Sequence, residues 1–271
     1  MKPDLSIIIV NFNTKDLIKD CVESIRKNCS LNVEIIVVDN NSQDGSVEAI
    51  MKLGVVAIFN KGNFGFAKAN NQGIKIAKSE YVFLLNSDTL IKKGSLEKIL
   101  TFAKAHPDAG VVGPRLFFKD GSLQNSCLRF PTIGNAIKEY WFGEKGLFDK
   151  YAPKGKSPVV VDSLVGAAFL MTPAALKKVG GLDERYFFYF EDIDYCRKVK
   201  RAGLKVYYLP EAEIIHFEGA SGKKIAKPKD QWRRLIPSSK IYHGTLKHYI
   251  LTLIILIGQK WAKLYGHIQK N

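Results

Sequence analysis

The feature that most constrains the fold is a pattern repeated along the first third of the chain, in which a short apolar run alternates with an amphipathic stretch. The four apolar runs, rich in Val, Ile, Leu and Phe, are Leu5–Val10, Val33–Val38, Val55–Phe59 and Tyr81–Leu85. Continuous apolar runs of this length are typical of strands buried on both faces. Strands that alternate with helices predict a parallel α/β sheet with right-handed crossovers.

Polar residues follow each of the four predicted strands. These residues are Asn11, Asp39, Asn60 and Asp88. Ligands of open parallel sheets bind beyond the carboxyl ends of the strands. We therefore expect these side chains to gather at one edge of the sheet and to line a binding site.

The rest of the chain is less regular. Thr14 is expected to cap a helix that ends near Asn28, and a strand near Gly110–Pro114 is expected to complete the sheet. Arg115–Pro158, rich in Gly, Lys and aromatic residues, is predicted to be a variable excursion. Further helices are predicted at Ser95–Ala105, from Pro173, and at Glu191–Ala202. Regular structure is expected to resume at Val159–Met171, and a strand is predicted at Lys205–Leu209.

The tripeptide Asn86-Ser87-Asp88 places an acid directly after a strand that is apolar through Leu85. One carboxylate with neighbouring oxygen donors suits a hard divalent ion that is shared with ligand phosphates. The alternative is that Asp88 caps the next turn, because Asx residues favour such positions.

A second acidic cluster, Glu191-Asp192-Ile193-Asp194, follows the aromatic run Phe187–Phe190. Burial against an aromatic wall raises the pKa of a carboxyl group and makes it a better general base. The alternative is that these acids complement the dipole of a helix N-terminus, and both can hold for different acids. His216, after a strand, is either a metal ligand or a structural histidine.

Several common functions lack their usual sequence support. The chain has no GxxxxGK[ST] phosphate loop, no GxGxxG after the first strand, no HExxH and no GxSxG. Its four cysteines show no CxxC pair or zinc spacing, which predicts free thiols in a reducing compartment. Leu5–Val10 is too short for the core of a signal peptide, so we expect a cytoplasmic protein.

In their order and spacing these motifs resemble the family 2 glycosyltransferases of the GT-A fold, in particular their rhamnosyltransferase-like group. The resemblance covers roughly residues 5–220 and implies a mostly parallel central sheet flanked by helices. The matching pieces are Ser6–Asn13, Val37–Ser42, Asn60–Gly65, Asn70–Gly73, Leu84–Asp88, Gly166–Met171, Gly181–Glu184 and Phe187–Arg197.

The resemblance also implies roles for individual residues. Asp39 would accept a hydrogen bond from the imide of a uracil or thymine base, and Gly65 would allow close backbone approach. Asp88 would bind Mg²⁺ or Mn²⁺ on the diphosphate, with His216 completing the metal site. The residues implied to line the nucleotide-sugar are Asn11, Asn13, Asp39, Asn60, Gly65, Phe66, Asn70, Asn86, Ser87 and Asp88.

Two further implications concern the chemistry. Asn86 stands where relatives have the first acid of a DxD-type motif, which leaves fewer ligand charges for the metal. Asp192 would be the general base that activates the acceptor hydroxyl, and displacement in one step would invert the anomeric configuration. Glu191 is the alternative base, because the register of adjacent acids is not settled by the sequence.

The charge of the chain is concentrated in a tail. The net charge is +15, of which residues 223–271 carry +10 with a single acid, Asp230. We therefore divide the chain into a GT-A catalytic domain, residues 1–222, and a basic helical tail, residues 223–271. The apolar centre of this tail, Tyr249–Ile257, is too short to span a bilayer. It is expected to form an interfacial helix on an anionic membrane, or a helix docked on the catalytic domain or on another subunit.

The resemblance implies an inverting, metal-dependent glycosyltransferase, and the basic tail places it at the inner face of the cytoplasmic membrane as an expectation. The donor would be dTDP-rhamnose or a UDP-sugar, and the acceptor a cell-surface glycan or a lipid-linked sugar. Self-association stays open. The alternative from a different class is a non-catalytic nucleic-acid-binding protein, which the positive charge would suit but for which the sequence offers no recognised module.

Overall fold

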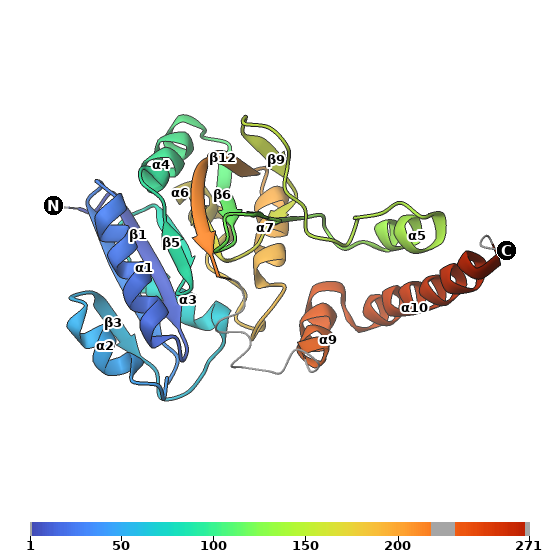
Figure 1. The fold of residues 1–271 in the computed structure, drawn as a ribbon, viewed down its shortest axis with the longest axis horizontal. Helices are drawn as coiled ribbons and strands as arrows, with labels where there is room; N and C mark the ends of the chain where they lie inside the picture. The colour runs from blue at the N-terminus through green and yellow to red at the C-terminus, as the bar shows by residue number, and fades with distance from the viewer. Residues whose placement is uncertain (1, 218–230, 269–271) are drawn as a thin grey trace.

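A large central sheet organises the chain in the computed structural model, which describes residues 2–217 and 231–268, with side chains for 2–217 and 235–261 (Figure 1). The sheet runs in the order β3-β2-β1-β4-β11-β6-β12-β5, with β7 beside β6 and β9 beside β12. The strands are β1 (Leu5–Asn11), β2 (Val33–Asp39), β3 (Val56–Phe59), β4 (Val82–Asn86), β5 (Thr89–Ile91), β6 (Ala109–Phe117), β7 (Leu123–Gln124), β9 (Val159–Val161), β11 (Ala168–Met171) and β12 (Lys205–His216). A separate pair is formed by β8 (Cys127–Leu128) and β10 (Ser163–Leu164).

The four strands predicted from the apolar runs are confirmed. β1 pairs in parallel with both β2 and β4, and β2 pairs in parallel with β3. The register sets Asn11 opposite Asp39, so the polar ends of these strands meet at one edge of the sheet. This is the edge at which the sequence predicts a binding site.

The strand predicted near Gly110–Pro114 is confirmed as β6, but it does not complete the sheet. The chain returns after β6 and inserts β11 between β4 and β6, antiparallel to both. β12 then pairs in parallel with β6 and antiparallel with β5. Each of these buried strands satisfies its backbone hydrogen-bonding groups by pairing with two neighbours. Because those neighbours are distant in sequence, no local pattern reveals the strand order.

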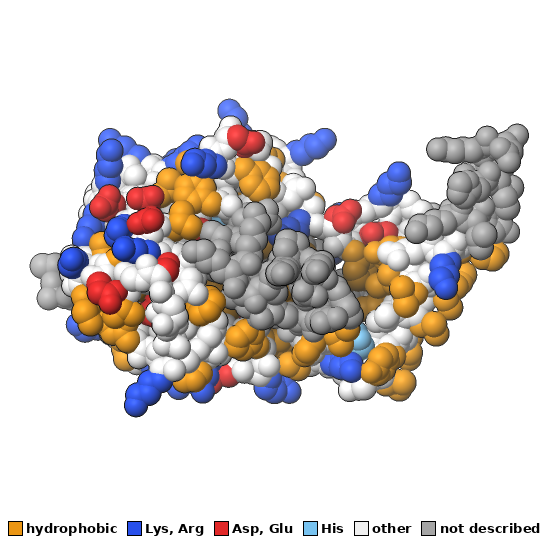
Figure 2. Space-filling view, turned by 60° about the horizontal axis from the view of Figure 1, so that its bottom comes forward, with side chains coloured by type: hydrophobic (Ala, Val, Ile, Leu, Met, Phe, Trp, Pro, Cys, Tyr) orange, Lys and Arg blue, Asp and Glu red, His pale blue; other side chains and the backbone are white. Residues whose placement is uncertain are grey.

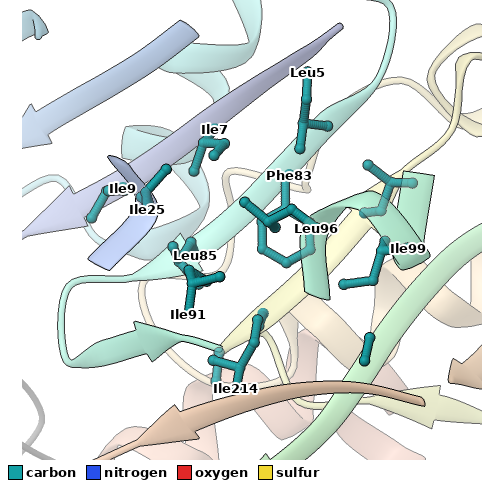
Figure 3. Packing of buried hydrophobic residues seen from close by; sticks show 14 of the residues in the cluster. Leu5, Ile7, Ile9, Ile25, Phe83, Leu85, Ile91, Leu96, Ile99 and Ile214 are labelled. Carbon is teal, nitrogen blue, oxygen red and sulfur yellow. The ribbon is translucent and has the colours of Figure 1, made fainter. Parts of the chain in front are cut away.

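Helices cover both faces of the sheet. Alternate residues of β1 and β4 point to opposite sides, since the side-chain period of a strand is two. On one face Leu5, Ile7 and Ile9 pack with Phe83 and Leu85 against α1 and α4 (Figure 3). On the other face Ile8, Val82 and Leu84 pack against α3, α6 and α7. The helices of this body are α1 (Lys15–Asn28), α2 (Ser46–Lys52), α3 (Phe66–Ile76), α4 (Ser95–Ala105), α6 (Pro173–Val179) and α7 (Glu191–Arg201).

Thr14 lies at the N-terminus of α1 but does not cap it through its side chain, contrary to expectation. Its hydroxyl donates to Asn11 Oδ1 at 2.6 Å and contacts Ser87 Oγ at 2.8 Å. The polar network at the strand ends therefore takes the hydroxyl that would otherwise cap the helix. The predicted free thiols are confirmed for Cys21, Cys29, Cys127 and Cys196.

Three helices form an arm beside the body: α5 (Ile133–Phe142), α9 (Gln231–His243) and α10 (Thr245–Ile268). Figure 1 shows α10 alongside α5, with α9 between α10 and the body. A Cβ on Gly258 of α10 would lie 2.7 Å from Tyr140 Cβ, so the two helices approach closely there. Trp141 Nε1 also donates to the carbonyl oxygen of Ile254 at 3.1 Å. The predicted excursion Arg115–Pro158 thus carries the helix against which the tail packs.

The body and the tail meet at α9. Ser238 Oγ donates to the carbonyl oxygen of Phe188 at 2.9 Å, and Arg197 donates to that of Tyr242 at 3.1 Å. The docked arrangement expected as one alternative for the tail is therefore present. The predicted boundary between residues 222 and 223, most of the basic segment 223–234, and the side chain of His267 lie outside the described residues.

Two histidines of the tail are enclosed by their neighbours: His248 is buried and contacts Ser239 Oγ at 2.8 Å through Nδ1. His243 is half-buried between Tyr242 and Phe190. In the described part of the chain no single helix is long and apolar enough to cross a membrane. Leu235–His243 and Thr245–Trp261 reach that length and composition only as a pair bent by 117°.

Candidate active site

A cavity of about 780 Å³ opens at the carboxyl edge of the sheet. This volume lies in the range of small-molecule sites. Its walls come from the ends of β1 and β4, the start of α3, the start of α7, the excursion and α9. The lining residues used below are Gly65, Phe66, Asn86, Ser87, Asp88, Gln124, Lys150, Gly166, Phe187, Phe188, Tyr189, Phe190, Glu191, Asp192, His216 and Leu235.

One wall of the cavity holds Asp88 together with His216. His216 Nε2 lies 3.4 Å from Asp88 Oδ1, and both side chains are buried. The contact arises because the backbone N–H of Phe217 donates to the carbonyl oxygen of Asp88 at 2.9 Å. β12 therefore delivers a histidine to the acid that follows β4, as the sequence resemblance implies.

Gln124 sets the orientation of the His216 ring. Its Oε1 lies 3.0 Å from His216 Nδ1, and Asn86 Nδ2 lies 3.5 Å from His216 Nε2. His216 Nε2 therefore faces Asp88 and Asn86, while the other ring nitrogen is held by Gln124, as is usual for a histidine that ligates a metal. Gln124 belongs to the short strand β7 inside the excursion, and no local sequence signal marks it.

Asp39 and Asn11 form a buried polar network beneath the cavity. Asp39 is 1% exposed and accepts hydrogen bonds from Asn11 Nδ2 at 2.8 Å, Ser42 Oγ at 2.6 Å and Ser42 N at 2.9 Å. These bonds fix the turn after β2 to the end of β1. Asp39 contributes no atom to the cavity lining, so its role as a reader of the nucleotide base stays a prediction.

Three other residues implied by the resemblance lie outside the cavity wall and make internal hydrogen bonds. Asn60 Nδ2 donates to Asn40 and Gln72, and Asn70 Nδ2 donates to the carbonyl oxygen of Phe66. Asn13 Oδ1 accepts from the backbone N–H of Gln43. Asn11, Asn13, Asp39, Asn60 and Asn70 thus surround the site without lining it, whereas Gly65, Phe66, Asn86, Ser87 and Asp88 line it.

Gly65 holds the aromatic segment Phe187–Phe190 in place. It adopts φ +84°, and a Cβ there would lie 2.9 Å from Phe187 Cα and closer still to its carbonyl oxygen. That oxygen accepts from the backbone N–H of Phe66 at 2.9 Å. The close approach that Gly65 permits is therefore that of Phe187, and only glycine fits.

The aromatic segment is itself strained. Tyr189 and Phe190 both have φ +71°, a left-handed conformation that non-glycine residues adopt at a cost of about 1–3 kcal/mol each. Phe190 is the residue immediately before α7. Contacts with Gly65, Phe66 and α9 therefore hold a backbone that would otherwise relax, and this backbone aims the first residues of α7.

Glu191 and Asp192 occupy the first turn of α7 and both line the cavity. Asp192 Oδ2 accepts from the backbone N–H of Gly166 at 2.8 Å, and Oδ1 accepts from that of Ile193 at 2.8 Å. Burial raises the pKa of Asp192, while these two N–H groups and the charge of Lys150 oppose the rise. Two fixed backbone donors therefore orient the carboxyl group of Asp192.

Glu191 differs from its neighbour. It is 5% exposed, and its Oε2 has no hydrogen-bond partner among the described residues. Burial and the charge of Asp192 raise the pKa of Glu191 well above its ordinary value. The third acid, Asp194, pairs with Arg197 and Lys198 on α7 and does not line the cavity, so it serves the helix.

The order of the central sheet and the cavity at its carboxyl edge agree with the GT-A type of glycosyltransferase fold. The mannosyltransferase PcManGT from Pyrobaculum calidifontis, solved in complex with GDP-Man and Mn²⁺, superposes with a TM-score of 0.60 at 16% identity. That match covers 93% of this chain and 65% of the other, so this chain spans about two thirds of its length. At this identity the likeness shows the fold alone.

Residues 6–169 match the glycosyl transferase family 2, and the chain belongs to that family. It is 24% identical over 269 residues to the low-salt glycan biosynthesis hexosyltransferase Agl10 of Haloferax volcanii, covering 96% of this chain and 84% of the relative. It is 27% identical over 236 residues to the N-acetylglucosaminyl-diphospho-decaprenol L-rhamnosyltransferase of Mycobacterium tuberculosis, covering 80% and 77%. The chain is therefore a glycosyltransferase, and nothing in these comparisons supports the nucleic-acid-binding alternative.

Proposed function

We propose that this glycosyltransferase moves a sugar, with inversion, from dTDP-rhamnose or a UDP-sugar to a hydroxyl of a cell-surface glycan or lipid-linked acceptor. The observation that carries the proposal is that one cavity holds both the Asp88–His216 pair and the carboxylate of Asp192. The Asp88–His216 pair suits a diphosphate with its cation, and the carboxylate of Asp192 suits an acceptor hydroxyl that must lose a proton.

Asp88 and His216 fit a divalent cation that arrives with the donor. Among the described residues no group of three or more His, Cys, Asp or Glu could hold a metal ion. A cation bound through one carboxylate and one imidazole takes its other ligands from substrate phosphates. His216 Nε2 and Asp88 Oδ1 lie 3.4 Å apart, close enough to share one such cation. When bound, Mg²⁺ or Mn²⁺ would neutralise charge on the diphosphate leaving group.

The chemistry required of the protein is one proton transfer and one displacement. The acceptor oxygen forms a bond to the anomeric carbon as the bond from that carbon to the donor phosphate oxygen breaks. The acceptor proton passes to a carboxylate oxygen of Asp192, and the nucleoside diphosphate leaves with the electron pair. Displacement in one step on the face opposite the leaving group inverts the anomeric configuration.

Of the two acids, we assign the base to Asp192. Two backbone N–H groups hold its ionised form toward the cavity. The raised pKa of buried Glu191 favours its neutral form, in which it can donate a hydrogen bond to the acceptor but cannot take a proton.

Replacing each acid by its amide separates the two roles. We expect Asp192→Asn to lower the transfer rate by about 10²–10⁴-fold, the usual contribution of a general base. We expect Glu191→Gln, which mimics a neutral acid, to stay within about tenfold of the unmodified enzyme. Because the base acts ionised, transfer should fall as pH drops through the raised pKa of Asp192. Steady-state rates from pH 4 to 9 check this, and a larger loss in Glu191→Gln than in Asp192→Asn would reverse the assignment.

Removing the metal ligand should act on donor binding. We expect Asp88→Ala to abolish the Mn²⁺-dependent part of nucleotide affinity, because a carboxylate ligand is lost. Titration calorimetry of UDP and dTDP, each with Mn²⁺ and with a chelator, measures this part. Asp16→Ala, an exposed acid on α1, is the matched control and should bind as the unmodified protein does. Equal Mn²⁺ dependence in Asp88→Ala would rule out this ligand role.

We also propose that the arm holds the enzyme on the inner face of the cytoplasmic membrane. α10 is apolar on two faces, and its inner face packs on α5 through residues such as Gly258. The outer face leaves a stripe exposed at helical spacing: Leu246, Tyr249, Ile250, Leu253, Leu256, Ile257 and Trp261.

The surroundings of this stripe fit an anionic lipid surface. Trp141 of α5, also exposed, stacks near Trp261 with ring centroids 6.4 Å apart and extends the apolar surface. Residues 235–261 contain three lysines and no acid. Figure 2 shows hydrophobic side chains gathered along the arm with Lys and Arg among them. Apolar burial and attraction to anionic lipid together support interfacial binding.

Flotation with vesicles tests the arm. We expect the unmodified protein to float with phosphatidylglycerol–phosphatidylcholine vesicles, and Leu253→Glu, in the middle of the stripe, to weaken partitioning by about tenfold. Gln259→Glu adds the same charge away from the stripe and is the matched control. Partitioning that is equal in all three proteins would exclude insertion of the stripe.

A further inference from the structure

One face of α9 contacts the backbone that leads into α7. Ser238 is 3% exposed, and its Oγ donates to the carbonyl oxygen of Phe188 at 2.9 Å. The ring of Tyr242 packs against that of Phe190, with centroids 5.4 Å apart. Ser238 and Tyr242 are one helical turn apart, so they lie on the same face of α9. This face therefore holds both Phe188 and the residue that immediately precedes α7.

The same face of α9 also contacts α7 beyond its first turn. Arg197 Nη1 donates to the carbonyl oxygen of Tyr242 at 3.1 Å, and the guanidinium lies over the Tyr242 ring at 3.7 Å. Arg197 also pairs with Asp194 on its own helix. Tyr242 therefore contacts Phe190 before the two cavity acids of α7 and Arg197 after them.

The backbone between these contacts needs support. Tyr189 and Phe190 have left-handed backbone angles, which persist only where the surroundings hold them. The carbonyl oxygen of Phe190 accepts from the N–H of Asp194 at 2.8 Å and so begins the hydrogen bonding of α7. Gly65 and Phe66 hold the aromatic segment at Phe187, while α9 holds it at Phe188 and Phe190. The direction of the first turn of α7 therefore depends on α9.

We propose that Ser238 and Tyr242 are positioning residues for sugar transfer: by holding Phe188 and Phe190, they aim the carboxylate of Asp192 at the reacting hydroxyl. This inference rests on the proposed function, which names Asp192 as the base. Neither Ser238 nor Tyr242 lines the cavity, so both act through the aromatic segment. Because a misplacement of about 1 Å costs about 10²-fold in rate, even a modest loosening of this contact is measurable.

Hydrolysis of the donor measures this positioning without an identified acceptor, because water can replace the acceptor hydroxyl and must also lose a proton. The probes are dTDP-rhamnose and UDP-glucose, each with Mn²⁺ and the full chain. We expect Ser238→Ala to lower kcat by about tenfold, because the hydrogen bond to Phe188 is lost. Ser238→Thr keeps the hydroxyl and should recover most of the rate. KM for the donor should stay unchanged, because other elements hold Asp88 and His216.

Matched variants separate positioning from general damage. Ser239→Ala removes the neighbouring hydroxyl of α9, which contacts His248 of α10 instead of the body, and should keep the unmodified kcat. Tyr242→Leu removes the ring that packs on Phe190 and should lower kcat, whereas Tyr242→Phe keeps the ring and should retain the rate. Asp192→Asn gives the rate without the base.

The outcomes distinguish this inference from the proposed function. Unchanged kcat in both Ser238→Ala and Tyr242→Leu, beside a large loss in Asp192→Asn, would overturn the positioning role. A donor KM that rises as far as kcat falls would also overturn it, because the whole site would then be damaged. Unchanged hydrolysis in Asp192→Asn, or none in the unmodified protein, would instead contradict the proposed function.

Hydrogen exchange tests the positioning without any donor. We expect Ser238→Ala to raise the exchange rate of backbone N–H groups in peptides covering residues 187–195 by about tenfold, because the start of α7 opens more readily. Peptides covering β1 should exchange as in the unmodified protein, and Ser239→Ala should leave residues 187–195 unchanged. Unchanged exchange of residues 187–195 in Ser238→Ala would overturn the proposal, whatever the rate of hydrolysis.

Discussion

The site depends on the short strand β11 and on the two residues before it. β11 pairs antiparallel with β4 and with β6, and so joins the first half of the sheet to the second. Just before it, the carbonyl oxygen of Ala167 accepts from the backbone N–H of Asn86 at 2.8 Å, and the N–H of Gly166 donates to Asp192 at 2.8 Å. Adjacent backbone groups thus fix the strand end that leads to Asp88 and the carboxylate of Asp192. A Cβ at Gly166 would lie 3.3 Å from the Phe66 ring and 3.4 Å from Asp192 Cβ. The side chains of Phe66 and Asp192 therefore pack closely against the backbone of Gly166.

The base side of the site is positioned by strain as well as by pairing. Tyr189 and Phe190 hold left-handed backbone angles immediately before the acids of α7. The segment is pinned from one side by Gly65 and Phe66 and from the other by Ser238 of α9. Contacts of the tail therefore reach the backbone that aims Glu191 and Asp192. The arm therefore helps to hold the segment before α7 in place. The same arm carries the exposed apolar stripe of α10.

Local patterns in the sequence are enough to predict the first half of the fold and the best-marked site residues. Each apolar run from Leu5 to Leu85 is a strand, and Asp88 and Asp192 line the cavity. Both acids could be predicted because the end of a strand and the start of a helix leave local signals in the sequence. β12 was predicted only to Leu209, because Pro210 and a shift of register between Leu209 and Glu213 interrupt its pattern. Its continuation is what carries His216 to Asp88. Gln124 reaches His216 through the pairing of β7 with β6, and no local pattern marks it.

The proposed mechanism uses one carboxylate, Asp192, in a single displacement at the anomeric carbon. The most direct test is the anomeric configuration of the first-formed product, measured by NMR with the nucleotide-sugar that stabilises the protein in a thermal-shift screen. Ligand binding raises apparent stability by mass action, so the screen selects the donor. We expect a product whose anomeric configuration is opposite to that of the donor. A product that retains the donor configuration would contradict it, because retention needs a second displacement or a different mechanism at the same face.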